Sequence, residues 1–371
     1  MKIELFKPSI LSGWHIGKQE YETAHKSNKL VKLVTELSNV CNLSCEGCFT
    51  KKIKGSWTNK TKKRLPDEMS YETSIAMVDE ACALGAISLD IVGAGEPTLD
   101  STFKEYIEYA LDKGLYVNVF THGANPALKE LAENWQEKNV SFFIKLWSLD
   151  QRLQDKYVSG AIENYSMQRD KALEFLISLG YAAGRDVTVD GIDYKLTRIG
   201  ADVLVMKSNY SEIPDIFRFC RNNNIMPEIK TYIPEGPTRL DHEHSRLIYT
   251  DSHLEKLRKE EINPEEFDKL RKDLIKIDQE FGIREMPTLY PQSCKCTQSM
   301  ASLYVTIQGD IRSCVGTHLS YGKYILGENM LQKVLQKRIE KVGFGCVPRL
   351  EDAAERHLQI NDDMKAIYSQ E

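Results

Sequence analysis

The chain has 371 residues, 42% of them hydrophobic, and its 49 basic and 54 acidic side chains leave a formal net charge of −5. This length and apolar content suffice for one large domain plus a smaller one, and they exclude a disordered protein. The mild, evenly spread charge excludes a nucleic-acid binder and a polybasic membrane-surface protein.

The N-terminal residues, MKIELFKPSILSGWH, lack the basic, apolar and small-residue order of a signal peptide. No stretch reaches the roughly 18 uncharged apolar residues of a membrane span. We therefore expect a soluble, cytoplasmic protein. Its nine cysteines then need a role other than disulfide bonding, because the cytosol keeps thiols reduced.

Short apolar segments alternate with longer amphipathic ones over the first two thirds of the chain. The strand candidates are 30–37, 87–93, 116–121, 141–147, 202–208 and 227–233. The helix candidates are 70–85, 102–114, 126–136, 168–180 and 211–223. This alternation predicts a parallel sheet curled with its helices outside. Six units are fewer than a closed barrel needs, so we predict an α/β fold, a partial (β/α)6 TIM-like barrel.

The remainder of the chain changes character after the last predicted strand. Asn263 followed by Pro264 is typical of the start of a helix, and strand-like residues recur at 302–307. The predicted parts are 1–29 (an N-terminal extension), 30–236 (the barrel), 237–290 (a helical connector) and 291–371 (a small cysteine-rich α+β domain with a C-terminal helix).

Residues 41–48, CNLSCEGC, follow the first predicted strand. They therefore fall on the edge where parallel strands end and where such sheets bind ligands. Three cysteines this close can hold one face of an iron–sulfur cube and leave one iron without a protein ligand. Zinc is the alternative, but structural zinc takes four ligands, and the nearest histidine along the chain is His25. Cys82 and Cys220, alone in helix-like segments, are expected to be small buried hydrophobes.

The cysteine spacing resembles the signature of radical S-adenosylmethionine (radical SAM) enzymes, whose cluster loop follows the first strand of such a barrel. The resemblance implies a 4Fe–4S cluster on Cys41, Cys45 and Cys48, with S-adenosylmethionine on the fourth iron. It also implies an electron donor such as flavodoxin or ferredoxin, and a 5′-deoxyadenosyl radical that abstracts hydrogen from a substrate. The residue before the third cysteine is commonly aromatic in this family. Here it is Gly47, and Phe49 is the candidate to contact adenine instead.

The segment IVGAGEP at 91–97 resembles the Gly-Gly-Glu-Pro segment of the same family, one strand–helix unit after the cysteines. Glycines let the backbone come close to a ligand. We therefore expect Gly93, Ala94 and Gly95 to offer carbonyl oxygens to the methionine ammonium, and Glu96 to add an acceptor. An ordinary turn at a strand end is the alternative.

Three further strand ends carry polar residues that the resemblance links to the cofactor. Thr121 lies in FTHG, where His122 replaces the family's Asn. In IKLWSLD, Lys145 and Ser148 lie on opposite faces, and the pattern does not decide between them. Asn209 follows the fifth strand. The alternative for each is a purely structural role.

The late part of the chain contains a second cysteine group. Its members are Cys294, Cys296, Cys314 and Cys346. Twelve residues separate Cys296 from Gly309 and four separate Gly309 from Cys314, which resembles the SPASM/twitch-type extension of radical SAM enzymes. Four cysteines resemble the shortened form with one auxiliary 4Fe–4S cluster. Either Cys294 is the fourth ligand or one iron is open to substrate; His318 as a ligand and a zinc site are the alternatives.

One auxiliary cluster suggests net oxidation of the substrate, although a lyase or isomerase reaction stays open. The 29 residues before the first strand are too few for a peptide-recognition domain, so we expect a small polar metabolite: a sugar, aminosugar, nucleoside or amino acid. A peptide- or protein-modifying enzyme and a non-catalytic metal-binding protein are the alternatives. No catalytic side chain is assigned. The candidates for substrate contacts are Arg198, Glu228, Lys230, Tyr232 and Arg239.

Overall fold

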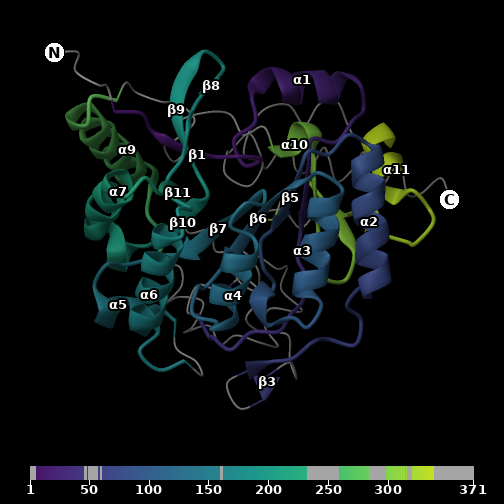
Figure 1. Cartoon of the computed structure of the whole chain (residues 1–371), viewed down its shortest axis with the longest axis horizontal. Coiled ribbons are helices and arrows are strands. Elements are labelled where there is room, and N and C mark those ends of the chain that lie inside the picture. The colour runs from purple at the N-terminus through teal and green to yellow at the C-terminus, as the bar shows by residue number, and fades with distance from the viewer. Residues whose placement is uncertain are drawn as a thin grey trace.

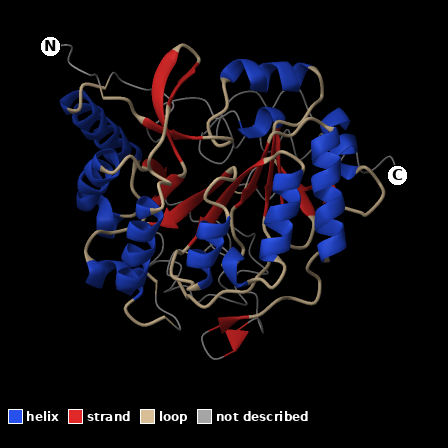
Figure 2. Cartoon of the chain, in the orientation of Figure 1, coloured by secondary structure: helices blue, strands red, loops and turns tan. Residues whose placement is uncertain are grey.

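A computed structural model describes most of the chain. The described residues are 6–45, 48, 57–58, 61–158, 162–231, 259–283, 298–313, 315 and 320–337. Within them, one sheet of nine strands runs in the order β11-β10-β7-β6-β5-β2-β12-β13-β14. Figure 2 shows these strands at the centre of the molecule with helices around them.

All six predicted barrel strands are present and adjacent. They are β2 (Lys32–Thr35), β5 (Ser88–Ile91), β6 (Tyr116–Thr121), β7 (Val140–Lys145), β10 (Ile199–Val205) and β11 (Met226–Thr231). Each pairs in parallel with its neighbour in the sheet. Parallel pairing brings the carboxyl ends of all six strands to one edge. The predicted α/β barrel-type fold is thereby confirmed.

The connecting helices also follow the predicted pattern. They are α2 (Tyr71–Ala83), α3 (Phe103–Asp112), α4 (Ala127–Asn134), α6 (Tyr165–Ser178) and α7 (Ile213–Asn222), with an unpredicted short α5 (Gln151–Tyr157). Ser70 caps α2 by accepting a hydrogen bond from the Thr73 backbone. Figure 1 shows α2 and α3 side by side along one face of the sheet. Cys220 is fully buried as predicted, whereas Cys82 is only partly buried.

The C-terminal segment continues the barrel sheet instead of forming a sheet of its own. Strand β12 (Ser302–Val305) pairs in parallel with β2, and β13 (Asp310–Arg312) and β14 (Ser320–Lys323) follow antiparallel. Buried Glu36 strengthens this junction, because its carboxylate accepts hydrogen bonds from Tyr304 Oη at 2.5 Å and from the Ile307 backbone at 2.9 Å. Two short helices flank these strands, α10 (Gln298–Ala301) and α11 (Met330–Lys337).

The N-terminal extension is built into the barrel. Its strand β1 (Ser9–Leu11) pairs with β9 (Ile192–Thr197), which forms a hairpin with β8 (Asp186–Val189). Helix α1 (Lys18–Lys26) follows. Trp14, in the segment between β1 and α1, packs on Phe120 and Phe143, with ring centroids 5.3 and 4.8 Å apart. Its indole nitrogen donates a hydrogen bond to Glu228 of β11.

The connector helix α9 (Pro264–Glu280) begins as the sequence predicts. Asn263 and Glu266 form a reciprocal capping box. The helix packs on α7 through Arg221 and Asp278, both fully buried and joined by two hydrogen bonds of 2.7 and 2.9 Å. Smaller elements are β3 (Trp57–Thr58), β4 (Thr61–Lys62), η1 (Pro97–Leu99) and η2 (Lys207–Glu212). Among the described helices, none has the length and apolar content to cross a membrane.

Candidate cofactor site at the carboxyl ends of the barrel strands

The three early cysteines lie in the segment that leaves β2 at the carboxyl edge of the sheet. Cys45 is buried, with 6% of its surface exposed, and Cys41 and Cys48 are partly buried. All three pack against one apolar cluster that includes Leu43 and Trp147. The Leu43 backbone N–H points to Cys41 Sγ at 3.5 Å, and such a donor stabilises a thiolate. Gly47 and Phe49 lie outside the described residues.

The segment after β5 passes directly beneath the cysteine segment. A Cβ on Gly95 would lie 2.1 Å from the Val40 carbonyl oxygen, so only glycine fits there. The next residue, Glu96, donates its backbone N–H to that carbonyl at 2.7 Å. Gly93 and Ala94 have positive φ angles of 130° and 24°, and this unusual backbone is typical of sites shaped for a ligand. The predicted glycine-rich loop therefore contacts the cysteine loop.

The Glu96 carboxylate is buried and is bonded within the protein. One oxygen accepts hydrogen bonds from the hydroxyls of Thr98 at 2.6 Å and Thr121 at 2.5 Å. The other accepts the His122 backbone N–H at 2.7 Å. The Thr121 hydroxyl also accepts the Gly123 N–H. Both side chains thus join the ends of β5 and β6, a structural role that the sequence pattern left open as the alternative.

Lys145, at the end of β7, faces the cysteines. Its ammonium lies 4.1 Å from the centre of the Trp147 ring. Burial acts to lower the pKa of Lys145, but the negative charges of the three cysteine thiolates and of the Asp202 carboxylate outweigh burial and raise it. Lys145 therefore stays a cation at neutral pH. Of the two residues that the sequence could not separate, it is the one directed toward the cluster loop.

Ser148 and Asn209 use their polar groups elsewhere. The Ser148 hydroxyl is fully buried and donates to Glu212 at 2.5 Å. Asn209, also fully buried, accepts from the Met206 backbone and donates to the carbonyls of Trp147 and Leu204. These bonds tie the ends of β7 and β10 together. The structure gives both residues structural partners, and the expected cofactor contact stays a prediction.

A charged pair lies beside Lys145 on the same side of the sheet. Asp202 is in register with Lys145, and Lys230 of β11 projects from the same face and bonds Asp202 at 3.0 Å. Burial acts to raise the pKa of Asp202, but Lys230 and Lys145 outweigh it and lower that pKa. Asp202 and Lys230 remain 19% and 38% exposed. The expected substrate candidate Lys230 is thus close to the cofactor site, together with Asp202, which the sequence analysis missed.

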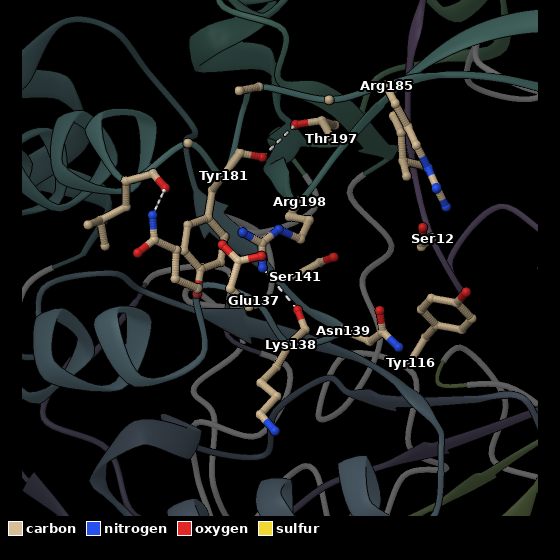
Figure 3. A pocket seen from close by; sticks show the side chains of 16 residues that line it. Ser12, Tyr116, Glu137, Lys138, Asn139, Ser141, Tyr181, Arg185, Thr197 and Arg198 are labelled. Atoms are coloured by element: carbon tan, nitrogen blue, oxygen red, sulfur yellow. Dashed lines mark hydrogen bonds between the residues drawn. The ribbon is translucent and has the colours of Figure 1, made fainter.

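Arg198 was predicted to contact the substrate, and its position in the structure corrects that prediction. It precedes β10 and so lies at the amino end of the strands, away from the cysteines. There it stacks on Tyr181 and donates to the carbonyls of Trp135 and Lys138. Figure 3 shows it in a polar cavity of about 540 Å³ whose wall includes Arg185. Arg198 precedes both the predicted strand at 202–208 and the observed β10, so grouping it with residues at the carboxyl ends of the strands was wrong.

The remaining predicted ligands, Cys294, Cys296, Cys314 and Cys346, lie outside the described residues, as do Tyr232, Arg239 and His318. Over the described ranges, no group of three or more His, Cys, Asp or Glu side chains is arranged to hold a metal ion. That arrangement describes ligands around a single ion. In an iron–sulfur cube each thiolate binds a different iron, so the three sulfurs need not surround one point.

Comparison with known proteins identifies the barrel. Residues 35–189 match the model of the radical SAM superfamily. The chain carries a radical SAM domain. The matched region contains the three cysteines, the glycine-rich loop and Lys145.

Two curated relatives are similar over different lengths of this chain. The sporulation killing factor maturation protein SkfB of Bacillus subtilis (strain 168) is 22% identical over 382 residues, covering 99% of this chain and 82% of its own. A tungsten-containing aldehyde ferredoxin oxidoreductase cofactor-modifying protein of Pyrococcus furiosus is 24% identical over 205 residues, or 51% of this chain and 48% of its own.

Two solved structures share the fold. Streptococcus suis SuiB bound to its precursor peptide SuiA has a TM-score of 0.57 and 14% identity, and the match covers 90% of this chain and 70% of SuiB. The protein anSMEcpe with bound AdoMet has a TM-score of 0.52 and 15% identity, with 81% of this chain and 80% of that chain covered.

The superfamily whose model matches residues 35–189 implies a 4Fe–4S cluster and S-adenosylmethionine, and the residues at the carboxyl edge fit this pair. The donor set is three thiols on one segment, one of them approached by a backbone N–H. Lys145 provides a cation beside them, and the Gly95 position provides close backbone packing.

Proposed function

We propose that this radical SAM enzyme cleaves S-adenosylmethionine reductively and abstracts a hydrogen atom from a peptide. The observation that carries the first half is that Cys41, Cys45 and Cys48, at least partly buried, pack against one apolar cluster at the carboxyl edge of the barrel. A 4Fe–4S cluster on these thiolates supplies, when bound, the electron that breaks the sulfonium of the cofactor and yields a 5′-deoxyadenosyl radical.

The chain's own residues prepare the site for this reaction. Lys145 offers an ammonium to the cofactor's carboxylate, and its raised pKa keeps that ammonium charged. The turn at Gly93 lets the backbone approach the methionine ammonium. Leu43 and Trp147, both buried, keep water from the space beside the cysteines. Glu96 and Asn209 hold the strand ends that carry these groups.

Two comparisons support a peptide as the substrate. The Bacillus subtilis relative that aligns with nearly the whole chain is named a maturation protein. Streptococcus suis SuiB, which has a similar fold, has been solved with a precursor peptide. Those names describe those proteins; for this chain the peptide is our proposal. A reduced flavodoxin or ferredoxin would supply the electron.

A small polar metabolite is the second candidate, and the Asp202–Lys230 pair favours it. The pair offers both acceptors and N–H donors, and each partner is partly exposed on the face that also carries Lys145. Such a pair suits a sugar, an aminosugar, a nucleoside or an amino acid. The same groups can bind one polar side chain of a peptide.

Net oxidation through an auxiliary 4Fe–4S cluster is a further part of the proposal. Its ligands would be Cys294, Cys296, Cys314 and Cys346. Anaerobic iron analysis tests it: two cubes give about eight irons per chain and one cube gives about four. Replacing Cys314 with Ala should then remove about four irons and leave reductive cleavage of S-adenosylmethionine in place.

Deuterium transfer decides the substrate class. A panel of short peptides with deuterated residues is incubated with the reduced enzyme and S-adenosylmethionine. We expect deuterium in 5′-deoxyadenosine and a mass change in the peptide. Transfer from a deuterated sugar or amino acid, with none from the peptide, would replace the peptide proposal by the second candidate.

A further inference from the structure

His122 has no assigned role in the chemistry above, yet it is buried, with 3% of its surface exposed, directly beside the cysteine segment. We infer that His122 is a positioning residue for the cluster loop and acts through a hydrogen bond to Asn42. Asn42 follows Cys41 directly. This inference rests on the proposed function, because the loop must hold the cluster that opens onto S-adenosylmethionine.

The hydrogen bonds determine which nitrogen of His122 carries the proton. The Ala124 backbone N–H, which can only donate, points to His122 Nδ1 at 2.9 Å, so Nδ1 is the acceptor. A neutral imidazole then has its proton on Nε2. This nitrogen lies 2.9 Å from Asn42 Oδ1 and 3.7 Å from Glu96 Oε2. Only the first distance is a hydrogen bond, so Nε2 donates to Asn42.

The backbone of His122 is held as firmly as its ring. Its N–H donates to the Glu96 carboxylate at 2.7 Å, and its carbonyl accepts the Tyr165 hydroxyl at 2.8 Å. Glu96 lies on the glycine-rich loop and Tyr165 begins α6. His122 therefore cannot follow the cysteine segment if that segment moves. The loop must adapt to the imidazole.

This arrangement fixes the loop between its first two cysteines. On one side of Asn42, the Val40 carbonyl is bonded to the Glu96 backbone. On the other, Leu43 is buried in the apolar cluster. The Asn42 side chain adds a directional bond between these two anchors. In other proteins, mutating a residue that orients the metal ligands through a hydrogen bond lowers metal affinity or activity by about 10- to 100-fold.

Two matched variants separate the effect of the hydrogen bond to Asn42 from the effect of the other contacts of the His122 side chain. In Gln the amide nitrogen reaches the place of His Nε2, whereas in Asn it reaches only the place of Nδ1. His122→Gln should therefore keep the donor to Asn42, and His122→Asn should lose it. Asn42→Ala removes the acceptor from the other side.

Three readouts apply to the anaerobic, reconstituted proteins: iron retained under a chelator, affinity for S-adenosylmethionine, and the electron paramagnetic resonance spectrum of the reduced cluster with and without the cofactor. We expect His122→Asn and Asn42→Ala to weaken cofactor binding about 10-fold and to alter the spectrum alike. The double variant should be no worse than either single one. His122→Gln should stay within about threefold of wild type.

The inference is overturned if His122→Asn and Asn42→Ala keep wild-type affinity and spectrum, or if their effects simply add. It is also overturned if His122→Gln folds normally, as its unfolding transition shows, yet loses as much as His122→Asn. Failure of the proposed function looks different. Wild-type protein would then hold iron without cleaving S-adenosylmethionine, and iron retention in the variants would still decide the role of His122.

Discussion

Gly95 shows at the scale of one residue how the barrel shapes the cluster loop. We predict that Gly95→Ala loses reconstituted iron and costs about 1–3 kcal/mol of stability. The added methyl group would lie 2.1 Å from the Val40 carbonyl oxygen and would force the segment before Cys41 away. Iron content and urea denaturation of the purified variant check this.

Gly114→Ala is the matched control. Gly114 also has a positive φ angle, +83°, but a Cβ there meets nothing within 4 Å. We expect it to lose about 1 kcal/mol from backbone strain and to keep its iron. Equal iron in the two variants would contradict the close packing that we assign to Gly95.

The charged neighbours of Asp202 lead to a prediction about how the stability of the protein depends on pH. Its pKa is lowered in the folded protein because Lys230 and Lys145 outweigh the effect of burial. A group whose pKa is lowered on folding contributes stability that is present above the unfolded value of about 3.9 and is lost as the pH falls through that value toward the lower folded pKa. Asp202→Asn should therefore show a shallower loss of stability than wild type between about pH 4.5 and about pH 2.5. Urea midpoints of the metal-free protein measure it, and identical slopes would argue against the ion pair.

The residues of the site differ in how far the sequence could predict them. The cysteine spacing and GAGEP are local patterns, and both segments lie where they were expected. The contacts of Thr121, Ser148 and Asn209 depend on which neighbour satisfies each polar group. That is decided between strands far apart in the chain, so a strand-end position alone could not reveal it.

Two helices, α7 and α9, provide a prediction at the scale of elements. Arg221→Met should cost about 3–5 kcal/mol, because it removes the two charge-assisted hydrogen bonds that Arg221 donates to the buried Asp278 carboxylate. Arg218→Ala is the control. Arg218 joins the same two helices through Glu280, but these side chains are 39% and 56% exposed to solvent, so the loss should stay below about 1 kcal/mol. Chemical denaturation compares them, and similar losses would refute the importance of burial.

Elements with a strong local signal were predicted, and those fixed by distant partners were not. The six barrel strands alternate with amphipathic helices, and all six form. The β8–β9 hairpin was missed, although Asp190 and Gly191, both with positive φ angles, are a typical hairpin turn. The strand predicted at 302–307 is present as β12. Its pairing with β2 joins residues that are far apart along the chain, so no local sequence pattern could indicate it.

The pairing of β12 with β2 has a consequence for the whole molecule. A chain that ends at residue 283 would leave β2 as an open edge and would remove two hydrogen-bond donors to buried Glu36, the Tyr304 hydroxyl and the Ile307 backbone N–H. We expect this truncated chain to aggregate or to unfold at a clearly lower temperature than the full chain. Light scattering and thermal unfolding test it; a stable monomer would show that the barrel does not depend on the C-terminal strands.

The sequence did not predict how the N-terminal and C-terminal segments pack on the barrel. The predicted boundaries separate an N-terminal extension and a C-terminal domain from the barrel. In the structure, Trp14 packs on barrel residues and β12 joins the barrel sheet. Composition marks where a segment changes character, but it does not tell whether that segment packs into the neighbouring core.

The most direct test of the central claim is reductive cleavage of S-adenosylmethionine. The anaerobically purified chain, reconstituted with iron and sulfide and reduced with dithionite, is mixed with the cofactor, and 5′-deoxyadenosine is quantified. Our account predicts its formation by wild type and none by Cys41→Ala, Cys45→Ala or Cys48→Ala. A reconstituted wild-type chain that binds iron but gives no 5′-deoxyadenosine, or a Cys45→Ala variant that forms it as fast as wild type, would contradict the account.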